Sequence, residues 1–271
     1  MAEKKGSEIR EARYLYCIIN SGANIDFGEM GIEDSFVYSI PYQDISAVVH
    51  KCAPKPYESK DENIVKEWIL AHQYIIDEAM KKCTAIIPFT FDTILKGDDE
   101  KVKEWLCQEY STLKEKLEKL EDKAEYTIQI FVEPEMILKE VENKSEEVRK
   151  LREEIKTKPK GIAYMLSKKL EKITKDEILK LESHYAKNFC TQIQDFVEEL
   201  KVEPTTKPVP DKWKDKKLIL NLVCLVNRNK VEKLGMMLDK INKTPQFKVR
   251  FTGPWAPFSF VGKEIGGKKV E

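Results

Sequence analysis

The order of hydrophobic and polar positions predicts short strands in the first part of the chain. Segments rich in β-branched and aromatic residues indicate strands over residues 14–19, 34–40 and 45–50. Pro41 is expected to end the second of them. Turn residues between the segments predict a sheet that is at least partly antiparallel.

A long amphipathic helix is expected next. Apolar residues recur at helical spacing from Ile64 to Ala79, with His72 on the same side, so one face should be buried. The pair Ser59 and Glu62 has the spacing of a capping box, in which two side chains satisfy free backbone N–H groups at a helix start.

A short strand and a second long helix complete this part of the pattern. The strand is expected over 85–91, at an edge or a bulge, because Pro88 cannot donate a ladder hydrogen bond. Gly97-Asp98-Asp99 breaks the chain and should cap a helix whose apolar stripe runs from Val102 to Leu120.

The second half opens with a period-two alternation over 126–132, typical of a strand with one buried face. Pro134 suits the first turn of a helix that should reach about residue 156. A further helix is expected over 162–200, restarted by a second capping box, Thr174-x-x-Glu177.

A proline-containing loop over 203–217 should separate this helix from a nearly all-apolar central strand over 218–226. A short helix over 229–241 and an alternating strand over 247–251 then follow. The order β-α-α-β-α-β indicates a modified ferredoxin-like arrangement.

These patterns predict an α+β chain of two domains. Residues 1–122 should form an N-terminal α+β domain with a mixed sheet and two long helices. Residues 123–271 should form a C-terminal modified ferredoxin-like domain that carries an aromatic C-terminal tail. A length of 271 residues fits two domains of moderate size.

Charge and hydropathy narrow the function classes. The 47 basic and 47 acidic residues cancel, so the basic excess typical of a nucleic-acid binder is missing, and we expect no nucleic-acid partner. No apolar stretch approaches the roughly 18 to 20 residues that span a bilayer, and the charged N-terminus lacks a signal-peptide pattern. We therefore expect a cytoplasmic protein without a lipid-membrane partner, and free cysteines, since none forms a C-x-x-C pair.

The common signatures of catalysis are missing from the sequence. It contains no G-x-S-x-G, Walker A or H-E-x-x-H pattern. Its histidines, His50, His72 and His184, do not have metal-ligand spacing. We expect no catalytic residue, metal or cofactor, and His72 is interpreted as a histidine packed in the core.

One segment near the C-terminus stands out. Residues 250–261 combine four aromatic residues with Pro254 and Pro257, which should forbid regular strand pairing, and Gly253 allows an unusual backbone angle. This rigid aromatic segment is expected either to close the hydrophobic core or to anchor a partner protein. The core-closing interpretation is favoured. The candidate protein-binding residues are Arg250, Gly253, Pro254, Trp255, Pro257, Phe258 and Phe260.

The same segment resembles the C-terminal signature of the gas vesicle protein L/F family, a stretch like R-x-T-G-P-W-P-P-Y-x-F. Ala256 stands where the family has its first proline after the tryptophan, and Phe258 where it has tyrosine. A second resemblance surrounds His72 and the strand after it, where the family reads like V-L-P-x-R-F-G-T. Here Thr90 replaces the usual arginine and Asp92 the usual glycine.

The resemblance covers about residues 12 to 262 and implies an accessory protein of gas vesicles, the hollow protein shells of aquatic microbes. It implies two α+β domains, no catalysis, and partners among the small hydrophobic shell protein and other accessory proteins. It leaves open F-type or L-type, and permanent component or transient assembly factor. From the residues alone, a ferredoxin-like nucleic-acid- or ligand-binding module is the alternative.

Overall fold

The computed structural model describes residues 11–206 and 211–262. The chain divides into two compact units, and each is described by itself. The first unit extends to Glu125 and also takes in the stretch from Pro254 onward, and the second is Tyr126–Gly253. The predicted boundary at residue 122 lies close to Glu125. The predicted division differs at the C-terminus, because the stretch from Pro254 groups with the first unit.

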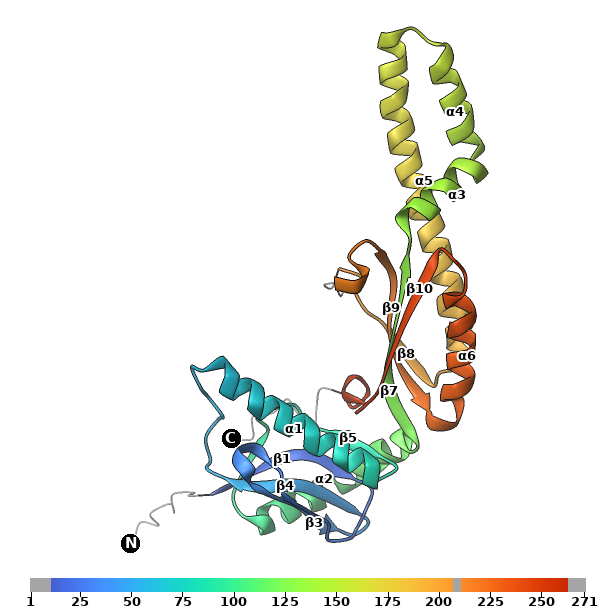
Figure 1. Cartoon of the computed structure of the whole chain (residues 1–271). Helices are drawn as coiled ribbons and strands as arrows, with labels where there is room; N and C mark the ends of the chain where they lie inside the picture. Colours follow the sequence, from blue (N-terminus) through green and yellow to red (C-terminus); the bar gives the residue numbers. More distant parts are fainter. Residues whose placement is uncertain (1–10, 207–210, 263–271) are drawn as a thin grey trace, which may run out of the picture. The chain divides into compact units, whose positions relative to one another are not determined.

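The first unit is a sheet with a long helix on each face (Figure 1). Its elements are β1 (Ala12–Ile19), β2 (Asp26–Glu29), β3 (Phe36–Tyr42), β4 (Ile45–Cys52), α1 (Glu62–Lys82), β5 (Ile86–Pro88), β6 (Ile94–Lys96) and α2 (Asp99–Leu120).

Strand β1 organises this sheet. The strand order is β2-β3-β4-β1-β5, and β6 also pairs with β1. Every residue of β1 is buried, because strands flank it on both sides and helices cover both faces. The pairings that join the described strands of this sheet are antiparallel, in line with the expectation of a sheet that is at least partly antiparallel. The mixed sheet predicted for this domain is not found among these strands. Pro41 does not end its strand, since it pairs with Ser46 beside the turn into β4.

The caps of the two helices differ in how well the sequence predicts them. Helix α1 is capped by Asp61, whose carboxylate accepts a hydrogen bond from the Asn63 backbone N–H at 2.9 Å. The predicted Ser59 instead accepts from the N–H of Asp61. Helix α2 begins as predicted, with Asp98 accepting from the Lys101 N–H.

The second unit pairs a sheet with helices of very unequal length (Figure 1). Its elements are β7 (Lys123–Val132), which begins in the first unit, α3 (Pro134–Lys144), α4 (Glu146–Thr157), α5 (Lys160–Gln194), β8 (Glu199–Val202), β9 (Lys217–Asn227), α6 (Val231–Asn242) and β10 (Phe247–Trp255).

The strand order of this sheet is β10-β7-β9-β8. Strand β9 is central and mostly buried, as its apolar run predicts. With the helices, the succession is β-α-α-α-β-β-α-β, which differs from the expected β-α-α-β-α-β by one more helix and by the strand β8. The mixed helix-and-sheet class is confirmed, and the ferredoxin-like assignment stays a prediction.

Helix α5 departs from the expected pattern at two places. It runs without interruption through Thr174, so that residue caps nothing. It ends at Gln194, and Leu200 lies in the short strand β8.

No helix in the part of the chain that the structure describes is long and apolar enough to cross a membrane.

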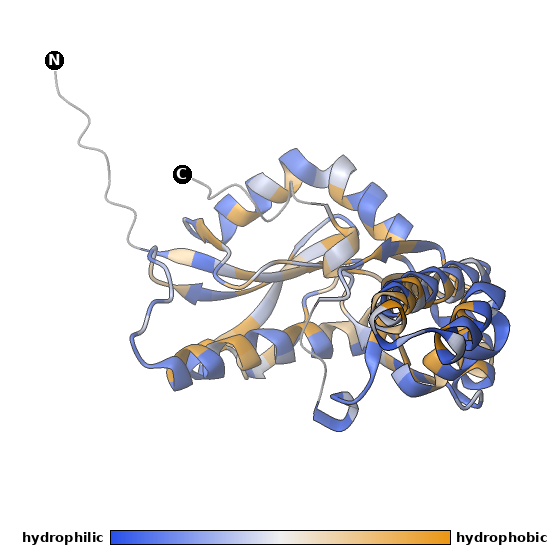
Figure 2. Ribbon diagram, turned by 90° about the horizontal axis from the view of Figure 1, so that it is seen from above, coloured by the Kyte–Doolittle hydropathy of each residue, from blue (hydrophilic) through white to orange (hydrophobic). Residues whose placement is uncertain are grey.

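A helical hairpin is the most extended feature of the second unit. Helix α4 and the first part of α5 lie side by side and project beyond the sheet (Figure 1). Pro159 starts α5 after the turn, and Ser145 separates α4 from α3 with a hydroxyl that accepts from the Val148 N–H. Both hairpin helices carry hydrophobic as well as hydrophilic residues (Figure 2).

Gly235 provides a test of the helical packing. It lies inside α6, and a Cβ added there would have no heavy atom within 4 Å. We predict that Gly235→Ala raises the free energy of unfolding by about 0.5–1 kcal/mol, because alanine loses less backbone entropy. Urea denaturation followed by circular dichroism measures this. Gly97→Ala is the contrasting variant and should destabilise, since Gly97 has a φ of +122°. A urea midpoint for Gly235→Ala below that of the wild type would contradict the open space that the structure shows beside Gly235.

Candidate functional site: the C-terminal segment and helix α1

The candidate binding residues do not form one site. Arg250 and Gly253 belong to the second unit, whereas those from Pro254 onward belong to the first. The Arg250 guanidinium donates a hydrogen bond to the Gln129 side chain at 3.1 Å, and Gln129 in turn donates to Asn221. Arg250 therefore takes part in the polar bonding of its own sheet.

Gly253 is required by the backbone. Its φ of +134° lies in a region that side chains other than glycine rarely adopt. Strand β10 continues past it through Pro254 to Trp255, so the prediction that Pro254 forbids regular strand pairing was wrong.

Most of the C-terminal segment closes the core of the first unit. Ala256 is fully buried in the cluster that contains Ile75 and Ile76 of α1, and Phe258 packs against that cluster. Phe260 is only 8% exposed. The favoured core-closing interpretation therefore describes these residues, and the small side chain of Ala256 suits its place in a packed interior.

Polar bonds hold the segment in place. The Ser259 hydroxyl and backbone N–H both donate to the Glu125 carboxylate, at 3.0 and 2.8 Å. The Lys116 ammonium group donates to the Val261 carbonyl at 3.1 Å. The segment is thus bound to residues at the end of α2 and the start of β7.

Trp255 is the exception in this segment. It is 44% exposed, although its neighbour Ala256 has no exposed surface. Of the proposed aromatic anchors, Trp255 is therefore the one that a partner can reach without unfolding the segment.

Helix α1 exposes several apolar side chains, among them Ile69, which the periodicity placed on the buried face. Its buried residues are His72, Ile75, Ile76 and Ala79. Ile69, Leu70 and Tyr74 are exposed instead, Leu70 by 58% and Tyr74 by 47%. Leu70 and Tyr74 are four residues apart and so share a helix face. The sequence signal was present, because α1 has more apolar residues than one buried face needs.

On the buried side of α1, His72 is part of a continuous chain of hydrogen bonds that includes Tyr14. The Asp92 N–H donates to the Tyr14 oxygen, and the Tyr14 hydroxyl donates to Nδ1 of His72 at 2.9 Å. Nε2 of His72 then donates to the Phe89 carbonyl at 3.1 Å. Because a carbonyl only accepts, this end fixes the proton on Nε2. The core interpretation of His72 is thereby confirmed.

Asp92 explains one departure from the expected family pattern. Its φ is +67°, a conformation that glycine adopts freely and that aspartate tolerates. Its carboxylate also accepts a hydrogen bond from the Tyr57 N–H at 2.9 Å. Aspartate is thus accommodated at the position where the resemblance leads one to expect glycine, and its side chain adds a hydrogen bond to the turn.

A second chain passes through His50. The Ile32 N–H donates to the Tyr16 oxygen, and the Tyr16 hydroxyl is hydrogen-bonded to Nδ1 of His50 at 2.8 Å. Nε2 of His50 is hydrogen-bonded to the Tyr57 hydroxyl at 2.9 Å. Tyr57 lines a surface hollow of about 370 Å³.

The two histidines are kept neutral by their surroundings. Burial lowers the pKa of His50 and that of His72 to about 4, and repulsion from His72 adds to the effect at His50. Across the described ranges 11–206 and 211–262, no cluster of three or more His, Cys, Asp or Glu side chains could hold a metal ion. His50 and His72 therefore serve as hydrogen-bonding groups of the core, and the outer side of α1 presents apolar side chains to solvent.

The chain is similar to several known proteins over most of its length. Residues 12–262 match the family model described as gas vesicle synthesis protein GvpL/GvpF. Gas vesicle protein L of Haloferax mediterranei is 25% identical, over 93% of this chain and 88% of that protein. Gas vesicle protein L1 of Halobacterium salinarum is 27% identical, over 93% of this chain and 91% of that protein.

Solved structures show a similar fold. The crystal structure of gas vesicle protein GvpF from Anabaena sp. PCC7120 matches with a TM-score of 0.72 at 15% identity, covering 93% of this chain and 98% of that one. GvpF from Microcystis aeruginosa matches with a TM-score of 0.64 at 16% identity, covering 93% and 99%.

The buried histidines predict a pH dependence of stability. In the unfolded chain a histidine has a pKa of about 6.5, so between pH 6.5 and about 4 the unfolded state binds protons that the folded state does not. Stability should therefore fall as pH drops through this window, by up to about 3 kcal/mol per histidine. Urea denaturation at pH 7.5, 6 and 5 measures this.

His72→Gln is the matched variant, because the glutamine amide retains a donor and an acceptor without titrating. It should lose less stability than the wild type between pH 7.5 and 5. An unchanged pH dependence in this variant would show that His72 does not carry the effect.

A separate prediction concerns the C-terminal segment. Phe260→Ala should destabilise the first unit by about 3 kcal/mol or more, since it removes a buried ring, whereas Trp255→Ala should cost less than about 1 kcal/mol. Thermal unfolding of both variants compares them. Equal destabilisation would mean that Trp255 is also part of the core.

Proposed function

Because the chain belongs to the GvpL/GvpF family of gas vesicle proteins, we propose that it is a gas vesicle accessory protein that binds the small hydrophobic shell protein and other accessory proteins. Its role is that of a minor structural component or an assembly factor at the gas vesicle. It acts by binding and not by catalysis.

The observation that carries this proposal is the apolar face of α1. Ile69, Leu70 and Tyr74 are exposed on a helix whose opposite side is anchored in the core by Ile75 and Ile76. Contiguous exposed apolar side chains mark interaction sites on folded proteins. A rigid helix that presents them loses little conformational entropy when a partner covers them.

The chemistry of the proposed partner suits this face. A shell subunit with a very apolar surface would aggregate before incorporation, and a protein that covers this surface until delivery would keep it apart from other copies. Binding to the shell subunit has to be reversible, because the subunit must be released on delivery. A few half-exposed apolar side chains supply modest binding energy, at roughly 25 cal/mol for each Å² of apolar surface buried.

Trp255 is proposed as a second contact. Tryptophan is enriched among the residues that dominate binding energy at protein interfaces. The buried neighbours of Trp255 hold its backbone, so the exposed ring is presented from a fixed position. Phe258 and Phe260 support this position and are not themselves proposed to reach the partner.

Co-purification tests the proposal. The tagged chain is co-expressed with the small gas vesicle shell protein, and an unrelated apolar peptide is the binding control. The wild type should recover the shell protein selectively in a stable complex. Leu70→Ser combined with Tyr74→Ser should lower the affinity roughly tenfold, because burial of the two side chains contributes on the order of 1–2 kcal/mol. Trp255→Ala should lower it several-fold.

Met236→Ser is the matched control. Met236 is 62% exposed on α6 of the second unit, so the variant removes a comparable apolar side chain elsewhere. It should bind as the wild type does. If the folded α1 double variant also binds as the wild type does, or if the unrelated peptide is recovered equally well, the proposed binding face is wrong.

A further inference from the structure

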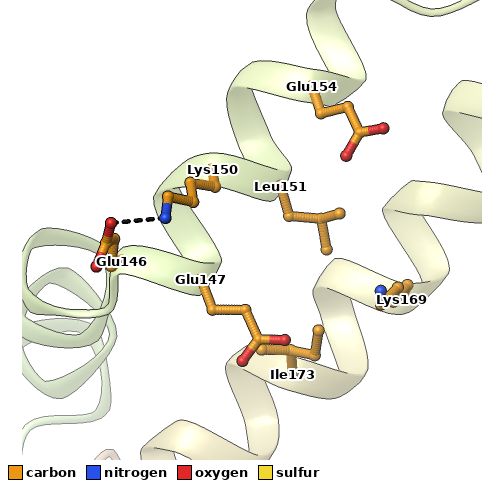
Figure 3. A pocket seen from close by; sticks show the side chains of 7 residues that line it. All are labelled: Glu146, Glu147, Lys150, Leu151, Glu154, Lys169 and Ile173. Atoms are coloured by element: carbon orange, nitrogen blue, oxygen red, sulfur yellow. Dashed lines mark ion pairs between the residues drawn. The ribbon is translucent and has the colours of Figure 1, made fainter.

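The hairpin of α4 and α5 has an open groove along one side. A hollow of about 440 Å³ lies between the two helices (Figure 3). Its apolar lining residues are Leu151 on α4 and Ile173 on α5. The two helices meet along a seam, and this side of the seam is not covered by another element of the described hairpin.

The rims of the groove carry opposite charges. Glu147 and Glu154 flank Leu151 on α4, at a spacing that places all three on one helix face. Figure 3 shows these side chains directed toward the space beside α5. Lys169 lies on the α5 rim, one turn before Ile173.

The charges on the two rims do not neutralise each other. In the described part of the chain, no salt bridge joins Lys169 to Glu147 or Glu154. Glu154 approaches only Lys158, at 3.7 Å, and both side chains are exposed. By contrast, Glu146 pairs with Lys150 at 2.7 Å (Figure 3). Glu147 also interacts electrostatically with Lys180, so the rim charges are balanced only in part by neighbours on their own side and not by each other.

Two exposed apolar residues of α5 lie between the groove and the hairpin tip. Ile162 and Met165 precede Lys169 by seven and four residues, so helical spacing puts them on the same side of α5 as Lys169 and Ile173. Both are exposed. An apolar strip with charged flanks therefore extends along much of the hairpin.

We infer that this groove binds an amphipathic helix of another protein, which completes a three-helix bundle. The occupant has an apolar ridge that covers Ile173 and the exposed Ile162 and Met165. It has basic residues on the flank facing Glu147 and Glu154 and an acidic residue facing Lys169, while Leu151, only 6% exposed, forms the floor of the groove. Helix α4 has 12 residues, or about 18 Å, so one occupant helix of roughly 12 to 18 residues fills the groove.

The mixed rims favour this occupant over others. A nucleic acid or an anionic lipid surface attracts a basic face and is repelled by the acidic rim of Glu147 and Glu154. An apolar helix with flanks of both signs satisfies both rims. This inference goes beyond shell-protein binding, since it concerns the second unit and a different class of partner surface.

A designed peptide tests the inference with the full chain. The probe is a fluorescein-labelled 18-residue helix with a leucine ridge, lysines on one flank and glutamates on the other. Fluorescence anisotropy should show saturable binding. Glu147→Lys combined with Glu154→Lys should weaken binding at least tenfold and should strengthen binding of a second peptide whose two flanks are both glutamate.

The control variant combines Glu153→Lys with Glu171→Lys. It makes the same total change in charge on the hairpin, with one substitution on α4 and one on α5, at exposed residues outside the groove. It should bind the first peptide within a factor of about three of the wild type. Ile173→Ser tests the apolar lining and should weaken binding, with circular dichroism checking that the hairpin stays helical.

Several results would overturn the inference. One is equal loss in the groove and control variants, and another is no peptide binding. Wild-type binding to phosphatidylserine vesicles without peptide binding would assign the surface to a membrane. A wild-type dimer in sedimentation that Glu147→Lys with Glu154→Lys dissociates would assign the groove to a second copy. Shell-protein co-purification should be unchanged in the groove variants, so the two proposals fail independently.

Discussion

The first unit depends on residues from the other end of the chain to complete its core. Ala256 is fully buried beside residues of α1, and Phe260 and Val261 are nearly so. Bonds from Ser259 to Glu125 and from Lys116 to Val261 hold this segment against the first unit. The chain therefore passes between the units twice, and the first unit cannot complete its core until the second has been synthesised.

This arrangement explains which apolar residues remain exposed. The segment packs against the cluster that includes Ile75 and Ile76, so the buried face of α1 is already occupied from within. Leu70 and Tyr74 lie outside that contact and remain exposed, as does Trp255.

The two proposed surfaces use different physical chemistry. The face of α1 offers apolar area, whereas the hairpin groove combines an apolar strip with rims of opposite charge. A protein that connects components of an assembly benefits from such surfaces, because they select different partners.

The sequence predicted those features that local chemistry determines. The buried strands β1 and β9 and the Asp98 cap follow from hydrophobic runs and a capping residue. Strand β2 was missed because it is four residues long and contains Gly28 at positive φ. Strand β8 was missed because Leu200 continues the helical period of α5, and only pairing with β9 makes it a strand. The cap of α1 was assigned to Ser59 because a hydroxyl and the Asp61 carboxylate are equally able to cap.

The candidate site was less predictable, because burial is a long-range property. The sequence identifies residues 250–261 as unusual, but it does not say that Ala256 enters the core while Trp255 remains exposed. Likewise, it does not say which apolar residues of α1 lie outside its buried face.

The most direct test of the account is hydrogen–deuterium exchange of the full chain with and without the gas vesicle shell protein. The account predicts that the shell protein slows exchange in α1 around Leu70 and in the backbone next to Trp255. Slowed exchange confined to the second unit, with α1 unchanged, would contradict it.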